Sequence, residues 1–309
     1  MTVKYSIVAP IFNELDNLDE LYRRVREVMS AQRGTWELVL VDDGSTDGST
    51  ERIRALARQD KHIRPVIFAR NFGHQIAITA GWDYARGEAV IIIDADLQDP
   101  PEAIPDLIAK WKEGFEVVYA VRAEREGETW FKRLSAAAFY RIIYRITDVK
   151  MPMDTGDFRL MDRKVVNVLK TMREGHRFAR GMSAWVGFRQ VGVAYKRAAR
   201  HVGATKYPFK KMFKLALNAI TGFSYFPLQL ATYVGFVAAA LSILAIPVVI
   251  FMRLAGHSAF LGQTTTLIAV LFLGGVQLIS LGVLGEYIGR IYDEAKGRPL
   301  YIVREAPKE

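Results

Sequence analysis

The sequence predicts an α/β fold, a doubly wound and mostly parallel sheet, with a two-helix transmembrane hairpin near its C-terminal end. Residues 5–120 alternate between short aliphatic runs and longer helix-like segments. That alternation is typical of repeated β-α units joined by right-handed crossovers. Further along, no Asp, Glu, Lys or Arg occurs in residues 215–252 or 254–285. Both apolar runs exceed the roughly 20 residues that cross a bilayer.

Five segments are rich in β-branched and aliphatic residues and are expected to be strands: 5–10, 37–43, 63–69, 89–96 and 115–121. The segments between them are expected to be helices: 17–31, 45–59, 74–85 and 101–113. Residues 38–41 and 89–94 are apolar at successive positions, as in central strands covered on both faces. Ligands of such sheets bind beyond the carboxyl ends of the strands. The loops after residues 10, 42, 69 and 94 are therefore expected to form the site.

The hairpin is expected to span a membrane near residues 226–252 and 264–285. Lysines and arginines are frequent outside it: Lys206, Lys210, Lys211 and Lys214 before, and Arg290, Lys296 and Arg298 after. The loop between the spans holds one arginine. Under the positive-inside rule, the N-terminal region and both termini are expected in the cytoplasm. Two buried helices of a soluble core are the alternative, but soluble helices of this length usually carry a charged face.

The predicted organisation is a cytoplasmic domain (1–205), a juxtamembrane amphipathic helix (206–225), two transmembrane helices (226–288) and a cytoplasmic tail (289–309). Residues 130–146 also place cations among aromatic and aliphatic residues, which favours a helix in the membrane interface. A helix packed on the sheet is the alternative for that segment. The formal charge of +9 then reflects a membrane and phosphate substrates, and no nucleic-acid partner is expected. The absence of cysteine excludes disulfides and thiolate chemistry.

Two features suggest a homo-oligomer, with a tetramer as one option. Small residues at Gly274, Gly275, Gly282 and Gly285 allow close packing of the second span. Residues 298–305 (RPLYIVRE) are expected to form a short strand, which pairs either with another subunit or with the edge of the sheet.

Polar residues follow all four of the strands whose ends form the expected site. In DADLQD, Asp94 and Asp96 face the same way if the backbone is extended. Paired carboxylates suit Mg²⁺ or Mn²⁺, and Gln98 can add a carbonyl oxygen. Asp99, before two prolines, is expected only to cap the next helix. An ordinary acidic turn is the alternative, but four polar strand ends at one edge favour a site.

In order and spacing, VAPIFNE, VDDGSTD, RNFGHQIAITAG and DADLQDPPE resemble the inverting glycosyltransferases of family 2, which have the Rossmann-like GT-A fold. DTGDFRLMDR (154–163) and RHVGATKYP (200–208), followed by two spans, narrow the resemblance. They are similar to the polyprenyl-phosphate glycosyltransferases, relatives of dolichol-phosphate mannose synthase, and most of all to the GtrB-type undecaprenyl-phosphate glucosyltransferases. The resemblance covers nearly the whole chain.

The resemblance implies metal-dependent transfer of one hexose from a nucleotide sugar, UDP-glucose, to undecaprenyl phosphate at the bacterial inner (plasma) membrane. A single displacement at C1 inverts the sugar and releases a nucleoside diphosphate. A GDP-mannose-dependent mannose synthase is the alternative within the family. A non-catalytic scaffold or flippase subunit is the alternative from another class. The chain lacks the Q-x-x-R-W motif of processive polysaccharide synthases.

The resemblance also assigns roles to residues. The base and ribose of the donor would be held near Pro10, Glu14, Asp43, Gly73 and His74. Asp94, Asp96 and Gln98 would bind the metal and the diphosphate. The phosphates of donor or acceptor would contact Arg122, Arg200 and Lys206, for which a solvated cation is the alternative. Asp157 would be the acceptor-side carboxylate, accepting a proton or orienting the phosphate. The alternatives are a turn-stabilising role for Asp157 and a catalytic role for Asp154.

Overall fold

The computed structural model describes residues 2–122, 155–196, 224–255 and 263–307. The expected interfacial segment 130–146 and the residues Asp154, Arg200 and Lys206 lie outside these ranges, as do residues 206–223 of the expected juxtamembrane helix. The chain forms two compact units. The first contains residues 1–145, 149–219 and 298–309, and the second contains residues 146–148 and 220–297.

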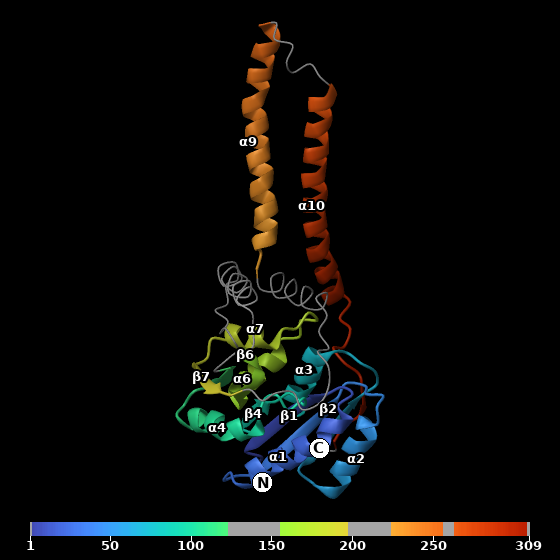
Figure 1. Ribbon diagram of the computed structural model, residues 1–309, viewed down its shortest axis with the longest axis vertical. Coiled ribbons are helices and arrows are strands. Elements are labelled where there is room, and N and C mark those ends of the chain that lie inside the picture. Colours follow the sequence, from blue (N-terminus) through green and yellow to red (C-terminus); the bar gives the residue numbers. More distant parts are fainter. Residues whose placement is uncertain (1, 123–154, 197–223, 256–262, 308–309) are drawn as a thin grey trace. The chain divides into compact units, whose positions relative to one another are not determined.

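The first unit is built on an eight-stranded sheet in the order β7-β5-β6-β4-β1-β2-β3-β8 (Figure 1). Its strands are β1 (Tyr5–Ile11), β2 (Trp36–Asp42), β3 (Ile63–Phe68), β4 (Ala89–Ile92), β5 (Val117–Arg122), β6 (Thr155–Asp162), β7 (Gln190–Tyr195) and β8 (Val303–Glu305). Strands β1 to β4 run parallel to one another, and β7 is parallel to β5. β6 is antiparallel to both of its neighbours, and β8 is antiparallel to β3. The expected mostly parallel sheet is thus confirmed.

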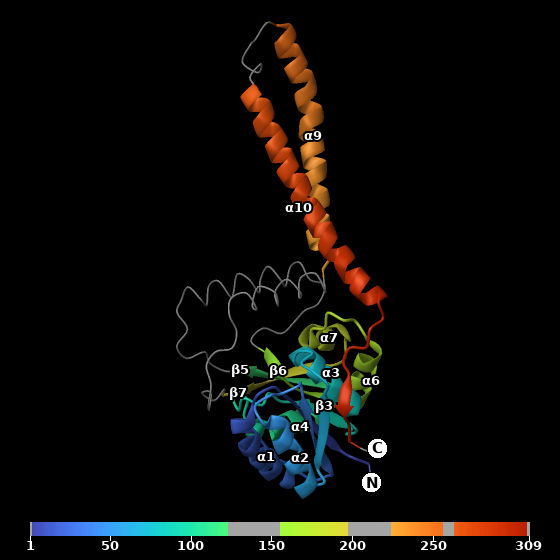
Figure 2. The ribbon, with the colours of Figure 1, turned by 90° about the vertical axis from the view of Figure 1, so that its right-hand side faces the viewer.

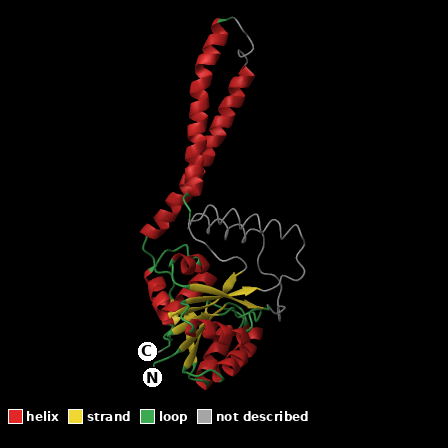
Figure 3. Ribbon diagram, turned by 90° about the vertical axis from the view of Figure 1, so that its left-hand side faces the viewer, coloured by secondary structure: helices red, strands yellow, loops and turns green. Residues whose placement is uncertain are grey.

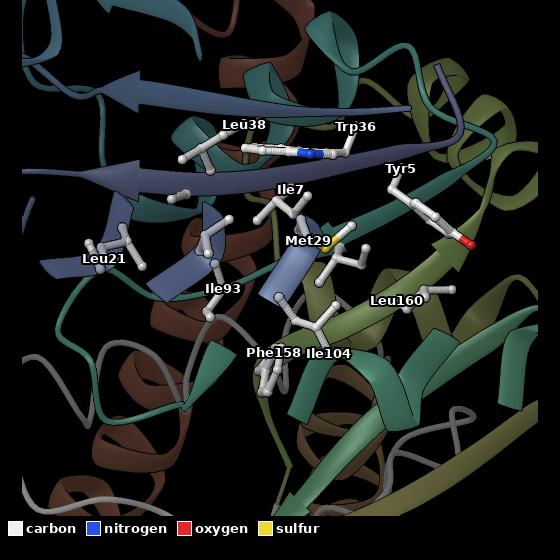
Figure 4. Close-up of a cluster of buried hydrophobic side chains, with 14 of the residues drawn as sticks. Tyr5, Ile7, Leu21, Met29, Trp36, Leu38, Ile93, Ile104, Phe158 and Leu160 are labelled. Carbon is white, nitrogen blue, oxygen red and sulfur yellow. The ribbon is translucent and has the colours of Figure 1, made fainter. Parts of the chain in front are cut away.

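Helices cover both faces of this sheet (Figures 1 and 3). They are α1 (Leu15–Ser30), α2 (Ser49–Gln59), α3 (His74–Tyr84), the short η1 (Pro101–Ala103), α4 (Ile104–Lys112), α6 (Arg163–Thr171) and α7 (Ala179–Trp185). On one face, alternate residues of β1 meet Leu21 and Met29 of α1 in the main core (Figure 4). On the other face, Gly81 of α3 lies so close to Val8 of β1 that a Cβ at Gly81 would be 2.1 Å from its Cγ1.

Strand β4 is shorter than the sequence predicts. It ends at Ile92, and the chain turns at residues 95–96 before Leu97 takes the left-handed conformation with φ of 59°. The extended alternation used to place Asp94 and Asp96 on one side therefore stops before Asp96. Because β1 to β4 are parallel, the loops that follow them still lie at one edge of the sheet.

The second unit contains two long apolar helices, α9 (Phe226–Leu254) and α10 (Gln263–Ala295). By length and composition, Phe226–Met252 and Ile268–Ala295 are candidate membrane spans, and none of their described side chains is buried. Pro247 lies inside α9. At the four glycines of the second span, an added Cβ would meet nothing within 4 Å, so the described part of this chain does not pack against them.

Candidate active site

The loops after β1 and β2 are joined by hydrogen bonds through Asn13 and Glu14. Asn13, in the left-handed conformation with φ of 55°, accepts a bond from the backbone amide of Thr46 at 2.9 Å. Glu14 precedes α1, and its Oε2 accepts a bond from Asn17 Nδ2 at 2.7 Å. Pro10 is buried within β1, opposite Val41. Glu14 is therefore partly exposed at the end of β1, whereas the side chain of Pro10 is buried.

Asp43, almost fully buried, organises the loop after β3. Its carboxylate accepts backbone hydrogen bonds from Phe72 at 2.6 Å and from Gly73 at 2.9 Å. Burial raises the pKa of Asp43, although these two bonds oppose the shift. Gly73 has φ of 105°, and an added Cβ would meet nothing within 4 Å. Asp43 thus positions this loop, and the loop leaves open space beside Gly73 at the start of α3.

His74, the first residue of α3, connects the two carboxylates expected on opposite sides of the reaction. Its Nε2 lies 3.2 Å from Asp157 Oδ2 and 3.6 Å from Asp94 Oδ1. Burial alone would lower the pKa of His74. The hydrogen bond to Asp157 and the charges of both aspartates outweigh burial and raise that pKa to about 9. His74 is therefore a cation at neutral pH, held between Asp94 and Asp157.

Asp94 carries the clearest sign of a cation site. Its Oδ1 is buried and has no hydrogen-bond partner in the structure. Burial raises the pKa of Asp94 to about 6, helped by the charges of neighbouring aspartates, and His74 opposes the shift. Asp96 Oδ1 accepts a hydrogen bond from the backbone amide of Gln98 at 3.1 Å. A buried carboxylate oxygen that accepts no hydrogen bond, near a second carboxylate, fits a hard divalent cation.

Within the described ranges, no three His, Cys, Asp or Glu side chains are grouped so that they could hold a metal ion by themselves. Mg²⁺ is commonly bound through one or two carboxylates together with substrate phosphates and water. The side chains present therefore fit an ion that arrives with a diphosphate, and they do not form an all-protein cage.

Asp157, near the start of β6, is only 4 % exposed and is enclosed by donors. Arg180 of α7 donates from Nε to its Oδ1 at 2.8 Å, and Gln75 of α3 donates to its Oδ2 at 3.1 Å. Burial would raise the pKa of Asp157, but Arg180 and His74 hold it well below the usual range. Asp157 is therefore an ionised anchor for two cations.

The turn before Asp157 is also fixed from within the fold. Arg159 is 3 % exposed; its Nη2 donates to the carbonyl oxygen of Gly156 at 2.8 Å, and its Nη1 donates to Ser183. Burial lowers the pKa of Arg159 to about 10, which still leaves it charged at neutral pH. This arginine fixes the backbone that carries Asp157.

Arg122 reaches the same turn from the end of β5. An added Cβ at Gly156 would lie 3.4 Å from Arg122 Nη2 and 3.7 Å from Asp99 Oδ2. Asp99 is fully buried and accepts a hydrogen bond from the hydroxyl of Tyr195. No side-chain cap exists at η1 or α4, so the expectation that Asp99 only caps a helix was wrong. Its burial next to a hydroxyl donor explains the difference.

The structure thus brings Asp94, His74 and Asp157 together and places Arg122 at the turn before Asp157. Two residues of this cluster, Gln75 and Arg180, were not predicted from the sequence. Gln75 also accepts a hydrogen bond from the backbone amide of Ala179 at 2.7 Å, which ties α3 to the start of α7. Gln75 could have been found from the sequence, because it directly follows His74. Nothing in the spacing around Arg180 marks it.

Open space beside Gly73, paired acids after β4 and an enclosed acid on β6 therefore lie at the carboxyl edge of the sheet. A model of glycosyl transferase family 2 matches residues 6–169, and the chain belongs to that family. A second model, the GtrB C-terminal hairpin, matches residues 226–291. The expected family and its GT-A fold are thereby confirmed.

Relatives match along almost the whole chain. An uncharacterized glycosyltransferase, YkcC of Bacillus subtilis, is 51 % identical over 98 % of this chain and 94 % of its own length. The bactoprenol glucosyl transferase of Shigella phage SfII is 44 % identical over 98 % of both chains. A prophage bactoprenol glucosyl transferase homolog of Escherichia coli is 43 % identical over 99 % of this chain and all of its own. Among solved structures, the mannosyltransferase PcManGT from Pyrobaculum calidifontis, in complex with GDP-Man and Mn²⁺, is 18 % identical over 93 % of this chain and 88 % of its own, with a TM-score of 0.47.

Proposed function

We propose that this protein transfers glucose from UDP-glucose to undecaprenyl phosphate, with inversion at C1, at the cytoplasmic face of the bacterial plasma membrane. The observation that carries the proposal is the cluster in which His74 joins Asp94, whose buried Oδ1 accepts no hydrogen bond, to the enclosed Asp157. The relatives named bactoprenol glucosyl transferases support both the glucose and the lipid acceptor. The two apolar helices support a membrane-bound acceptor.

A divalent cation, Mg²⁺ or Mn²⁺, would be held by Asp94 and Asp96, with the side-chain carbonyl of Gln98 as a further oxygen. When bound, it would offset the negative charge that develops on the leaving diphosphate. Asp94 and Asp96 bring the required negative charge to the end of the sheet. Burial and the neighbouring aspartates raise the pKa of Asp94, and a bound cation would lower it again.

In the proposed step, an oxygen of the acceptor phosphate forms a bond to C1 while the bond from C1 to the diphosphate oxygen breaks. The nucleoside diphosphate leaves with the electron pair, and no sugar becomes attached to the enzyme. The second pKa of a phosphate monoester is about 6, so the nucleophile is already ionised at neutral pH. The step therefore needs positioning and charge balance more than it needs a general base.

Asp157 is poorly suited to accept a proton, because its pKa lies well below the usual range while a general base works best near the operating pH. We assign it the orienting role, in which it holds Arg180 and His74 at the place where two anionic groups must meet. Arg122, with Arg200 and Lys206, would contact the phosphates of donor or acceptor. Glu14, Asp43 and Gly73 would line the base and ribose pocket, with Pro10 contributing only backbone.

The test is incubation of the purified full-length protein with undecaprenyl phosphate, Mg²⁺ or Mn²⁺, and a panel that includes UDP-glucose and GDP-mannose. Mass spectrometry of the lipid identifies the sugar, and the anomeric configuration of the product tests inversion. We expect glucosyl lipid from UDP-glucose. Mannosyl lipid formed only from GDP-mannose would favour the mannose synthase. No lipid-linked sugar from any donor would favour the scaffold or flippase alternative.

Metal dependence is tested with EDTA and with Asp96→Asn. We expect EDTA to abolish transfer and added Mg²⁺ or Mn²⁺ to restore it. We expect the rate of Asp96→Asn to be at least a hundredfold below that of wild type, which corresponds to a loss of about 2.7 kcal/mol of transition-state stabilisation. The matched control is Asp106→Asn, an exposed aspartate in the first turn of α4, which we expect to leave the rate unchanged. Full activity of Asp96→Asn would contradict the metal role.

The proposed orientation can be read with single cysteines, because the natural chain has none. Ala255→Cys, after α9, should react with a membrane-impermeant maleimide in spheroplasts, whereas Gln59→Cys at the end of α2 should react only after lysis. The reverse pattern would contradict a cytoplasmic catalytic domain. A homo-oligomer stays a prediction, and the mass of the detergent-solubilised protein by light scattering tests it.

A further inference from the structure

Residues 298–305 follow the second unit in the chain but belong to the first unit, and we call them the C-terminal strap. The strap has no role in the proposed chemistry. Its strand β8 lies antiparallel to β3 at the sheet edge, where Val303 pairs with Phe68 (Figure 2). The amide of Ala69 donates to the carbonyl oxygen of Ile302 at 2.9 Å. The strap thus reaches the residue at which β3 leads into the loop that carries Gly73.

Tyr301 makes the main side-chain contacts of the strap. Its ring stacks on Phe68 with centroids 5.1 Å apart and planes at 15°. Phe68 in turn meets Phe72 edge-on at 5.6 Å and 88°. The hydroxyl of Tyr301 donates to Asp83 Oδ2, near the end of α3, at 2.7 Å. A single side chain therefore touches the strand before the loop and the helix after it.

The same loop (residues 69–73) is held on its other side by the loop after β2. The backbone amides of Phe72 and Gly73 donate to Asp43. Gly44, with φ of 72°, approaches so closely that an added Cβ would lie 2.6 Å from the carbonyl carbon of Arg70. A segment held from two sides gains freedom when one side is removed, even where the rest of the fold is intact.

We propose that the C-terminal strap positions the loop at residues 69–73 for the nucleotide of the donor, with Tyr301 as its positioning residue. The role in donor binding rests on the proposed function. Residue 298 follows α10 by only three positions, so the chain that leaves the apolar hairpin also holds the nucleotide loop. The ring acts on the loop through Phe68, which meets Phe72. The hydroxyl is less important, because Arg173 also holds Asp83, at 2.8 and 3.1 Å.

Hydrogen exchange of the full-length protein in lipid nanodiscs, without substrate, tests the strap itself. In Tyr301→Ala we expect the amides of residues 70–76 to exchange at least several-fold faster, with β1 and β4 unchanged. Tyr301→Phe, which keeps the ring, should stay near wild type. Arg54→Gln, which removes ion pairs with Glu305 at the far end of β8 and with Glu51 of α2, is the control and should not alter this loop. Unchanged exchange in Tyr301→Ala, or an equal rise throughout the sheet, would overturn the proposal.

Steady-state kinetics of the same variants test the consequence for the donor. Loss of an aromatic pair corresponds to about a two- to tenfold change in an equilibrium constant. We expect the KM for UDP-glucose to rise by roughly that factor in Tyr301→Ala, with kcat and the KM for undecaprenyl phosphate unchanged and with Tyr301→Phe near wild type. Equal changes in both KM values would overturn the donor-side role. If the wild-type protein transfers no sugar, the proposed function fails, while the exchange experiment still decides the strap.

Discussion

Arg180 is the residue on which the interpretation of the acceptor side can be tested most directly. Its Nε donates to Asp157 Oδ1 at 2.8 Å, and its Nη2 makes a weaker contact with Oδ2 at 3.4 Å. Replacing it with alanine removes one good charge-assisted hydrogen bond. Such bonds contribute about 1.5–3 kcal/mol. The Arg180 side chain is 32 % exposed, so solvent screening places the loss in the lower part of that range, about 1.5–2 kcal/mol.

That loss predicts a fall in kcat/KM for undecaprenyl phosphate of about ten- to thirtyfold, measured from initial rates at saturating UDP-glucose. Asp157 keeps its bonds to Gln75 and His74, so we do not expect the 3–5 kcal/mol penalty of a buried charge left without any partner. For a unit of this size, the same loss should lower the melting temperature by roughly 3–8 °C. Arg180→Lys should recover part of the activity, because an ammonium keeps the charge but loses the fork geometry.

Arg24→Ala is the matched control for Arg180→Ala. Arg24 makes a two-bond contact with Glu102 at 2.9 and 2.5 Å, in the same unit but between α1 and η1. Its loss should lower stability without a selective effect on the acceptor. The assignment of Arg180 would be refuted if Arg180→Ala kept kcat/KM within twofold of wild type, or if Arg24→Ala lowered kcat/KM by the same factor.

Three further predictions concern other parts of the structure. The pKa of His74 is raised to about 9, so the stability that its charge contributes is complete below its unfolded pKa of about 6.5 and is lost as the pH rises towards 9. Between pH 6 and pH 9, urea unfolding in EDTA should therefore show a smaller fall in unfolding free energy in His74→Gln than in wild type. An equal fall in both proteins would contradict the ion pair. Gly44→Ala should displace the loop at residues 69–73 and raise the KM for UDP-glucose about tenfold or more, as a displacement costing about 1.4 kcal/mol would. Gly187 is the control, because it has a similar φ of 73° but no atom closer than 3.9 Å to an added Cβ. Gly187→Ala should lower only the melting temperature. Tyr195→Phe removes the hydroxyl that donates a hydrogen bond to the buried Asp99. The change should lower the unfolding free energy by about 1–3 kcal/mol. A denaturant midpoint equal to that of wild type would contradict this.

The part of the site that the sequence predicted is the part built by neighbouring residues. The apolar runs of β1 to β4 and the polar residues after them are local patterns, and parallel pairing brings their ends to one edge. Asp94 and His74 could be placed on that basis. The expected extension of the strand to residue 96 failed, because the turn at residues 95–96 depends on surroundings that a pattern of apolar residues does not describe.

The surroundings of Asp157 could not be predicted in the same way. β6 inserts antiparallel between β4 and β5, so its partners come from distant parts of the chain. Gln75 and Arg180, which bind Asp157, lie 82 and 23 residues away from it. Arg159 is a charged residue in a buried strand. A pattern of apolar residues counts such a charge as evidence against a strand, although here both of its Nη atoms donate hydrogen bonds within the fold. The C-terminal strap was predicted as a strand with two possible partners, and the sheet edge is the one observed.

The charges around Asp157 explain why a carboxylate lies where two anionic substrates are proposed to meet. Asp94 and Asp157 contribute two negative charges, and His74 and Arg180 contribute two positive ones, so this group of four is neutral before any substrate binds. The two cations offset part of the desolvation penalty of the buried Asp157 carboxylate, and its hydrogen bonds hold both cations in place in advance. In the proposed reaction, cations held in this way would need no reorganisation when charge moves to the leaving diphosphate. Because the proposed acceptor phosphate is already ionised, a proton acceptor would add little, whereas an anchor for Arg180 and His74 would help to stabilise that charge.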